Sequence, residues 1–190
     1  MNLTVDLNRQ MLEDVQSRLG GMSNKAPNAI TSALNRTLTN IASNVSKEVR
    51  KEYNIKASDV KQTITKTKAS RSNMTALVVS KGNLVPLDRF KVSPRAVQPK
   101  RKKPIKVGVK KDGGLKTTVG AFVSDINGIK VFQREGRKRL PVKRLFGPSV
   151  PQMLGNDEVV NRINQEGALM FNNRIDHEIN RILGRGQSTS

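Results

Sequence analysis

Apolar residues recur at helical spacing near both ends of the chain. One stripe steps by four, four, three, four and four residues: Ile30, Leu34, Leu38, Ile41, Val45 and Val49. The other steps by three or four residues: Val160, Ile163, Gly167, Phe171, Ile175, Ile179 and Ile182. These stripes predict two long helices over residues 26–53 and 157–183, the second capped by Asn156 and ended by Gly184. A shorter helix is expected before them, ending at Gly20-Gly21.

The spacing changes to two in the middle of the chain. Short strands are predicted at residues 76–80, 84–87 and 117–124, after a polar linker at 65–73. Between residues 105 and 110, apolar side chains alternate with lysine or glycine, as in a strand with one buried face. Asn127-Gly128 is a strong hairpin signal, and Pro141 places the strand that returns after residue 139 at a sheet edge.

These patterns predict an α+β fold. A small antiparallel β-sheet, from about residue 76 to 146, carries a projecting basic hairpin and is flanked by the long N-terminal and C-terminal helices. We divide the chain into an N-terminal helical region (1–75), a basic β-rich region (76–151) and a C-terminal helix and tail (152–190). Together they are expected to form one structural domain.

Positive charge is concentrated in the same central region. The chain has a formal net charge of +20, and residues 89–144 carry 18 lysines and arginines against 3 acids. One group of cations is expected to contact DNA or an acidic lumen: Lys100, Arg101, Lys102, Lys103, Lys106 and Lys110. A second group in the hairpin is expected to contact another subunit or partner: Arg134, Arg137, Lys138, Arg139, Lys143 and Arg144.

Candidate catalytic residues are scarce. The single histidine, His177, lies beside an apolar stripe and is interpreted as a surface or boundary residue. There is no cysteine, no phosphate-binding glycine loop and no concentration of metal-ligating side chains. We therefore expect no enzyme activity, no cofactor, no metal and no small-molecule substrate. The pattern predicts neither a signal peptide nor a membrane span.

Two segments allow more than one interpretation. A short helix capped by Ser58 or Asp59 follows the long N-terminal helix, and the pair is either a helix-turn-helix or a plain helical corner. The basic segment 100–103 is either a solvated charge run or part of a cationic face shared with the hairpin. Because aromatic residues for base stacking are few, any nucleic-acid contact should be with phosphates and independent of sequence.

Several blocks of sequence resemble the minor tail protein Z family of long-tailed bacteriophages, also called tail completion proteins. They are ALNRT at residues 33–37, KEVRKEYNIKASDV from residue 47, LVVSKGNLVPLDRFKV from residue 77, and GAFV and VFQREGRKRLPVKRLFGPSVPQM within 120–153. The resemblance extends over residues 8–183. It implies a structural virion component, assembled in the bacterial host cytoplasm, that completes the tail near its head-proximal end.

The resemblance also implies partners: a ring of identical subunits that meets the terminator, the connector and the tail tube, with phosphate-backbone contact to genomic DNA as a further expectation. Two alternatives stay open at this stage. One is a sequence-nonspecific nucleic-acid-binding protein, ribosomal-like or nucleoid-like, whose binding should depend steeply on salt. The other is an adaptor at the tail tip or baseplate.

Overall fold

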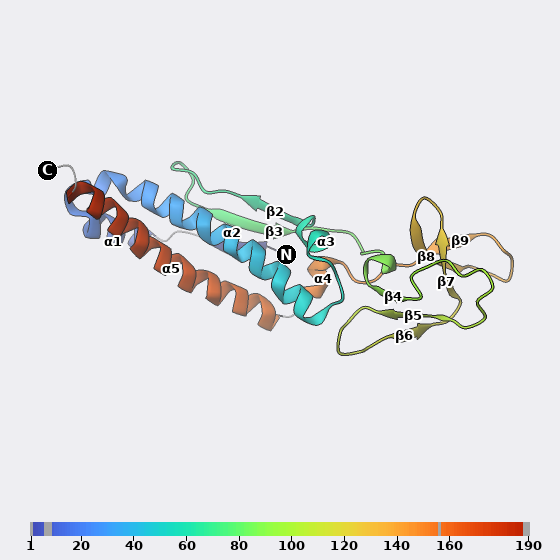
Figure 1. Cartoon of the computed structure of the whole chain (residues 1–190). Helices are drawn as coiled ribbons and strands as arrows, with labels where there is room; N and C mark the ends of the chain where they lie inside the picture. Colours follow the sequence, from blue (N-terminus) through green and yellow to red (C-terminus); the bar gives the residue numbers. More distant parts are fainter. Residues whose placement is uncertain (1, 6–8, 156, 188–190) are drawn as a thin grey trace. The chain divides into compact units, whose positions relative to one another are not determined.

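The structure is a computed structural model that describes residues 2–5, 9–155 and 157–187. The chain divides into two compact units, coloured along the sequence in Figure 1. Unit 1 comprises residues 1–45, 64–80 and 155–190, and unit 2 comprises residues 46–63 and 81–154. The predicted Asn156 cap lies outside the described residues.

Unit 1 is built on two long helices. Helix α2 (Ala26–Glu52) contributes most of its length to this unit, and α5 (Asp157–Gln187) runs beside it (Figure 1). Helix α1 (Arg9–Leu19) is joined to α2 by the 3-10 helix η1 (Gly20–Lys25). Both predicted stripes are confirmed as core, since their side chains are buried except for Val160, which is half-buried. Gly167 of α5 lies so close to α2 that an added Cβ would stand 2.8 Å from Ile41.

Charged side chains connect the helices of unit 1. Glu178 is almost fully buried, and its carboxylate pairs with Arg181 at 2.7 Å and Arg36 at 3.6 Å. Arg18 of α1 pairs with Asp176 of α5 at 2.6 Å, and this hydrogen bond raises the pKa of the guanidinium above its usual value. These pairs fix the register between α5 and the two N-terminal helices. His177 is exposed on α5, as predicted.

A three-stranded antiparallel sheet completes unit 1. Its strand order is β1 (Asn2–Val5), β3 (Ala76–Ser80) and β2 (Ile64–Thr67). The prediction of a polar linker over 65–73 is therefore wrong in its first part, because residues 64–67 pair with 77–80. Only Ile64 of β2 is even half-buried, so the strand lacks the alternation that would have revealed it.

Unit 2 contains two further three-stranded antiparallel sheets. In one, β5 (Ile105–Gly108) lies between β4 (Lys91–Ser93) and β6 (Lys116–Thr118). In the other, β8 (Ile129–Arg134) lies between β7 (Ala121–Asp125) and β9 (Val142–Arg144). The α+β class is confirmed, but the strands of the described residues form three sheets instead of one.

Local details of unit 2 also differ from the prediction. The strand expected at 117–124 is divided at Gly120, whose positive φ of 72° turns the chain between β6 and β7. Residues 84–87 form no strand; Pro86 makes an isolated bridge to Phe146, and Leu87 begins the 3-10 helix η2 (Leu87–Arg89). The hairpin turn at Asn127-Gly128 is confirmed, with φ values of 52° and 99°.

The helix ends were only partly predicted. Helix α5 continues through Gly184 to Gln187, so that glycine does not end it. The short helix α3 (Ala57–Lys61) begins before the predicted caps, after Lys56, which makes no side-chain capping bond. With five residues and a buried face at Asp59 and Val60, α3 is a helical corner and too short for a DNA recognition helix. A further short helix, α4 (Val150–Met153), is held by a Ser149–Gln152 capping box.

Candidate functional site

The six cations of the basic run at residues 100–110 are all exposed in unit 2. Only Lys106 lies within a strand, on the open face of β5 between the buried Ile105 and Val107. Lys91 lies on the same face, because it pairs with Gly108 two residues along β5. The predicted alternation is thus confirmed for 105–107, whereas Gly108 is buried and residues 100–103 precede the strand.

Two members of the basic run interact with their own chain. The Arg101 guanidinium donates to the backbone oxygens of Lys103 at 2.8 Å and Pro104 at 3.4 Å, which stabilises the loop before β5. The Lys110 ammonium lies 5.7 Å from the centre of the Tyr53 ring, a cation–π contact. The other four lysines project from the loop and from β5.

The hairpin cations separate into two groups. Arg134 stacks on Phe122, with 5.5 Å from the guanidinium to the ring centre, and Arg144 lies 5.8 Å from the Phe146 ring. The remaining four, Arg137, Lys138, Arg139 and Lys143, are exposed, and no acidic side chain in the described part of the chain forms an ion pair with them. Strand β9 pairs with β8 alone among the described strands, which confirms the predicted edge position.

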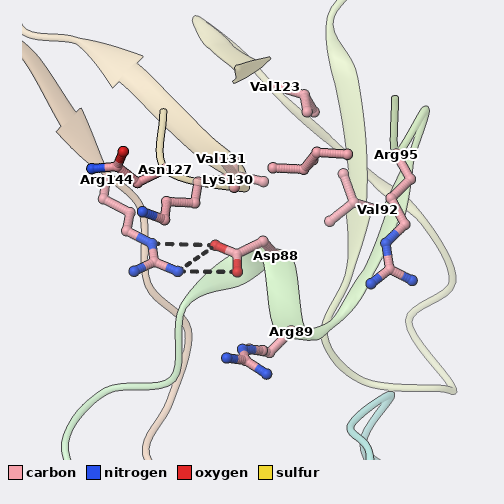
Figure 2. Close-up of a pocket in the computed structure, with 11 residues that line it drawn as sticks. Asp88, Arg89, Val92, Arg95, Val123, Asn127, Lys130, Val131 and Arg144 are labelled. Atoms are coloured by element: carbon pink, nitrogen blue, oxygen red, sulfur yellow. Dashed lines mark hydrogen bonds and ion pairs between the residues drawn. The ribbon is translucent and has the colours of Figure 1, made fainter. Parts of the chain in front are cut away.

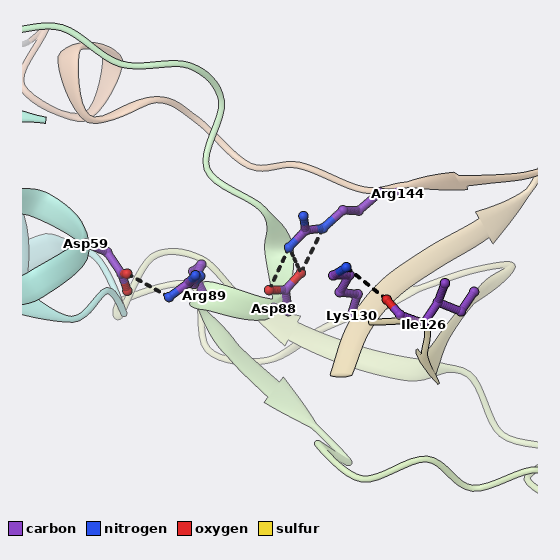
Figure 3. A network of polar contacts seen from close by, with 6 residues as sticks. All are labelled: Asp59, Asp88, Arg89, Ile126, Lys130 and Arg144. Carbon is purple, nitrogen blue, oxygen red and sulfur yellow. Dashed lines mark hydrogen bonds and ion pairs between the residues drawn. The ribbon is translucent and has the colours of Figure 1, made fainter. Parts of the chain in front are cut away.

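Arg144 forms an ion pair with Asp88 inside unit 2. Its Nη2 donates to both carboxylate oxygens of Asp88 at 3.0 Å, and its Nε donates to Oδ1 at 3.3 Å. Arg89, which follows Asp88 in the chain, donates through Nη1 to the carboxylate of Asp59 in α3 at 3.0 Å. Figure 3 shows how η2 directs these adjacent side chains to opposite sides, one toward β9 and one toward α3.

A groove of about 400 Å³ opens beside this ion pair. Four cations and one acid line it (Arg89, Arg95, Lys130, Arg144 and Asp88), together with the valines Val92, Val123 and Val131 (Figure 2). A second hollow of about 250 Å³ shares Asp88, Arg89 and Arg95 and adds Asp59 and Lys91. Both hollows are formed entirely by unit 2.

The sequence interpretation missed this groove. Its residues come from η2, from β4 and the chain after it, from β7, β8 and the turn between them, and from β9. Only Arg144 belonged to a predicted site. One signal was present: Asp88 is the sole acid between residues 60 and 111. An acid isolated in a long basic segment indicates a structural ion pair, but not its partner.

The Arg144–Asp88 pair gives a stability prediction with a matched control. The Asp88 side chain is 13% exposed, so Arg144→Gln leaves a nearly buried carboxylate without its partner. We expect the free energy of unfolding of unit 2 to fall by about 2–4 kcal/mol. The neighbouring Lys143 is exposed, and Lys143→Gln should change this free energy by less than about 0.5 kcal/mol.

The measurement is urea unfolding followed by tyrosine fluorescence. Tyr53 is the only tyrosine, the chain has no tryptophan, and the ring is buried in unit 2, so the signal reports that unit alone. Equal unfolding midpoints for the two variants would show that the ion pair adds nothing to stability.

The single histidine and the acids are spread over the described part of the chain. Among the described residues, no group of three or more histidines and acids is placed to hold a metal ion. Nor does any helix within the described ranges have the length and apolar character needed to span a membrane. The described part of the chain forms a helical unit and a basic β-rich unit with an exposed hairpin. This architecture is typical of a structural protein that assembles with other proteins.

The comparison with known families agrees with this class. The family described as prophage minor tail protein Z matches residues 11–185, most of the chain. The chain belongs to this family, and it is therefore a structural protein of a bacteriophage tail. No curated protein and no solved structure was found to match it.

Proposed function

We propose that this protein completes the tail at its head-proximal end, where copies form a ring that joins tail to head and surrounds the path of the DNA. The observation that carries the proposal is the distribution of charge. Unit 2 contains 24 of the 35 lysines and arginines and 7 of the 15 acids, so it holds +17 of the net charge of +20. Unit 1 is nearly neutral by comparison.

Several copies of unit 2 in one ring would repel one another unless an anion neutralises them. Genomic DNA in the lumen is the anion we assign to the basic run, because its lysines are exposed and mostly without ion pairs among the described residues. A compact ammonium attracts a phosphate backbone as a point charge and does not require one fixed geometry. Such contacts should be additive and interchangeable.

The hairpin is assigned to protein neighbours: the terminator, the connector, the tail tube or an adjoining copy. Support comes from the free edge of β9, whose backbone groups are available for pairing with another chain. The exposed Arg137, Lys138, Arg139 and Lys143 would then meet acidic side chains on the neighbour. Because the family is one of phage tail proteins, a ribosomal or nucleoid protein is no longer an alternative.

A graded substitution series tests the DNA contact. Lys100, Lys102, Lys103 and Lys106 are changed to glutamine one after another, and each variant is scored separately for incorporation into tails and for DNA delivery. We expect incorporation to be unchanged and delivery to fall step by step, because each phosphate contact contributes a similar amount. The matched Lys→Arg series keeps every charge, so both incorporation and DNA delivery should stay at the level of the parent protein.

Arg101 is left out of the series because its guanidinium stabilises its own loop. Loss of incorporation at the first glutamine would contradict the DNA contact and indicate a protein interface. Antibody labelling of purified virions locates the protein independently. Label at the tail tip instead of the neck would overturn the head-proximal position in favour of a baseplate adaptor.

A further inference from the structure

The groove in unit 2 offers cations whose charge the chain itself does not neutralise. Asp88, its one acid, accepts three hydrogen bonds from Arg144, which leaves little of its charge for other partners. Arg95 is exposed and makes no ion pair or hydrogen bond with any residue in the described ranges. In Figure 2, Arg95 and Arg144 lie on opposite sides of Asp88. The wall formed by Arg95 is therefore an open binding position for an anion.

The adjoining hollow contains an unsatisfied acceptor. Asp59 is buried, with its side chain 7% exposed, and Arg89 binds its Oδ1 at 3.0 Å. Its other oxygen, Oδ2, has no hydrogen-bond partner in the described chain. A buried acceptor without a donor costs free energy, and Oδ2 is enclosed in the folded chain. A ligand N–H group that reaches the Asp59 carboxylate as the hollow opens would remove this cost.

These two features together select the kind of ligand. A DNA backbone has phosphate acceptors but no N–H donor for Asp59, and its regular row of charges would meet Asp88 inside the groove. A peptide supplies a backbone N–H for Asp59, a carboxylate for Arg95 and Arg89, and apolar side chains for the valines Val92, Val123 and Val131. Planar guanidinium groups match the two oxygens of a carboxylate.

We propose that the two adjoining hollows form one docking groove for an acidic peptide segment in which acidic and apolar side chains alternate, contributed by a neighbouring tail protein. The proposal rests on the proposed function only in naming a tail protein as the source of the peptide. The groove is separate from the basic run and from the projecting tip of the hairpin. It gives unit 2 a protein-specific contact in addition to its general attraction for polyanions.

The test uses the full chain, labelled with ¹⁵N, and an acetylated and amidated Glu-Val-Glu-Val-Glu-Val peptide. Nuclear magnetic resonance spectra are recorded during titration with this peptide, with the matching Gln-Val peptide and with a short DNA duplex. The acidic peptide should shift the amide signals of Val92, Lys130 and Val131. The Gln-Val peptide should leave these three signals unchanged, and DNA should shift signals of the basic run instead.

The decisive variant is Arg95→Gln, which removes the unpaired guanidinium without breaking a contact of the folded chain. It should weaken binding of the acidic peptide about tenfold, the effect of losing one charged hydrogen bond. Arg71→Gln is the matched control: this arginine is also exposed, lies in unit 1, and its loss should leave the affinity unchanged.

Three results would overturn the proposal: no binding of the acidic peptide, equal affinity of Arg95→Gln and the parent, or DNA shifting the same groove signals. The last would assign the groove to phosphate. Because the titration is done on the isolated protein, its outcome is independent of where the protein lies in the virion. A protein found at the tail tip would thus refute the proposed function and leave the groove intact.

Discussion

Leu34→Asp is expected to unfold unit 1. Leu34 is fully buried in the stripe of α2, so the substitution removes a large apolar side chain and buries an unpaired carboxylate. The free energy of unfolding should fall by at least about 4 kcal/mol, a large part of the total for a domain of this size. Far-ultraviolet circular dichroism at increasing urea concentration measures this decrease in the free energy of unfolding. The helical signal reports unit 1 because α2 and α5 contain most of the helical residues.

The same α2 helix offers a matched control. Ser43 is exposed in unit 1, and Ser43→Asp introduces the same charge about two and a half turns along the helix without burying it. It should change the free energy of unfolding by less than about 0.5 kcal/mol. Ile175→Asp tests the opposing stripe of α5, where the side chain is also buried. If both core variants unfold at the parent's urea concentration, the two stripes are not the core of unit 1.

Removal of the hairpin tip is expected to abolish incorporation into tails. Residues 135–139 are deleted and Arg134 is joined to Leu140 through an Asn-Gly turn, which suits a tight hairpin. The paired residues of β8 and β9 are retained, as is the Arg144–Asp88 ion pair, so unit 2 should still fold. Tyr53 fluorescence checks the folding, and quantitative mass spectrometry of purified tails measures incorporation.

A second variant separates the charge of the tip from its length. Arg137, Lys138 and Arg139 are changed together to glutamine, which keeps the backbone and removes three cations. If acidic side chains on a neighbour recognise the tip, this variant should fail in the same way as the deletion. If backbone pairing is sufficient, it should be incorporated normally. Incorporation of the deletion variant at the parent's level would exclude the hairpin tip from the interface.

The sequence alone determined the elements whose formation depends on residues close together in the chain, such as single helices and tight turns. The stripe from Ile30 to Val49 predicted α2 because a helix places every third or fourth side chain on one face. Asn127-Gly128 predicted its hairpin because both residue types tolerate the positive φ values that a tight hairpin loop needs, and both have them here. The family, too, was identifiable from sequence blocks, and the match over 11–185 confirms it.

Other features were decided by the tertiary structure alone. Strand β3 pairs with β1, more than seventy residues earlier in the chain, and the mostly exposed β2 has no pattern of its own. The groove in unit 2 assembles from segments around residues 88–95, 123–131 and 144, and its ion pairs join Asp88 to Arg144 and Asp59 to Arg89. Periodicity reports which face of an element is buried, whereas strand partners and ion pairs depend on contacts between distant segments that only the folded chain brings together.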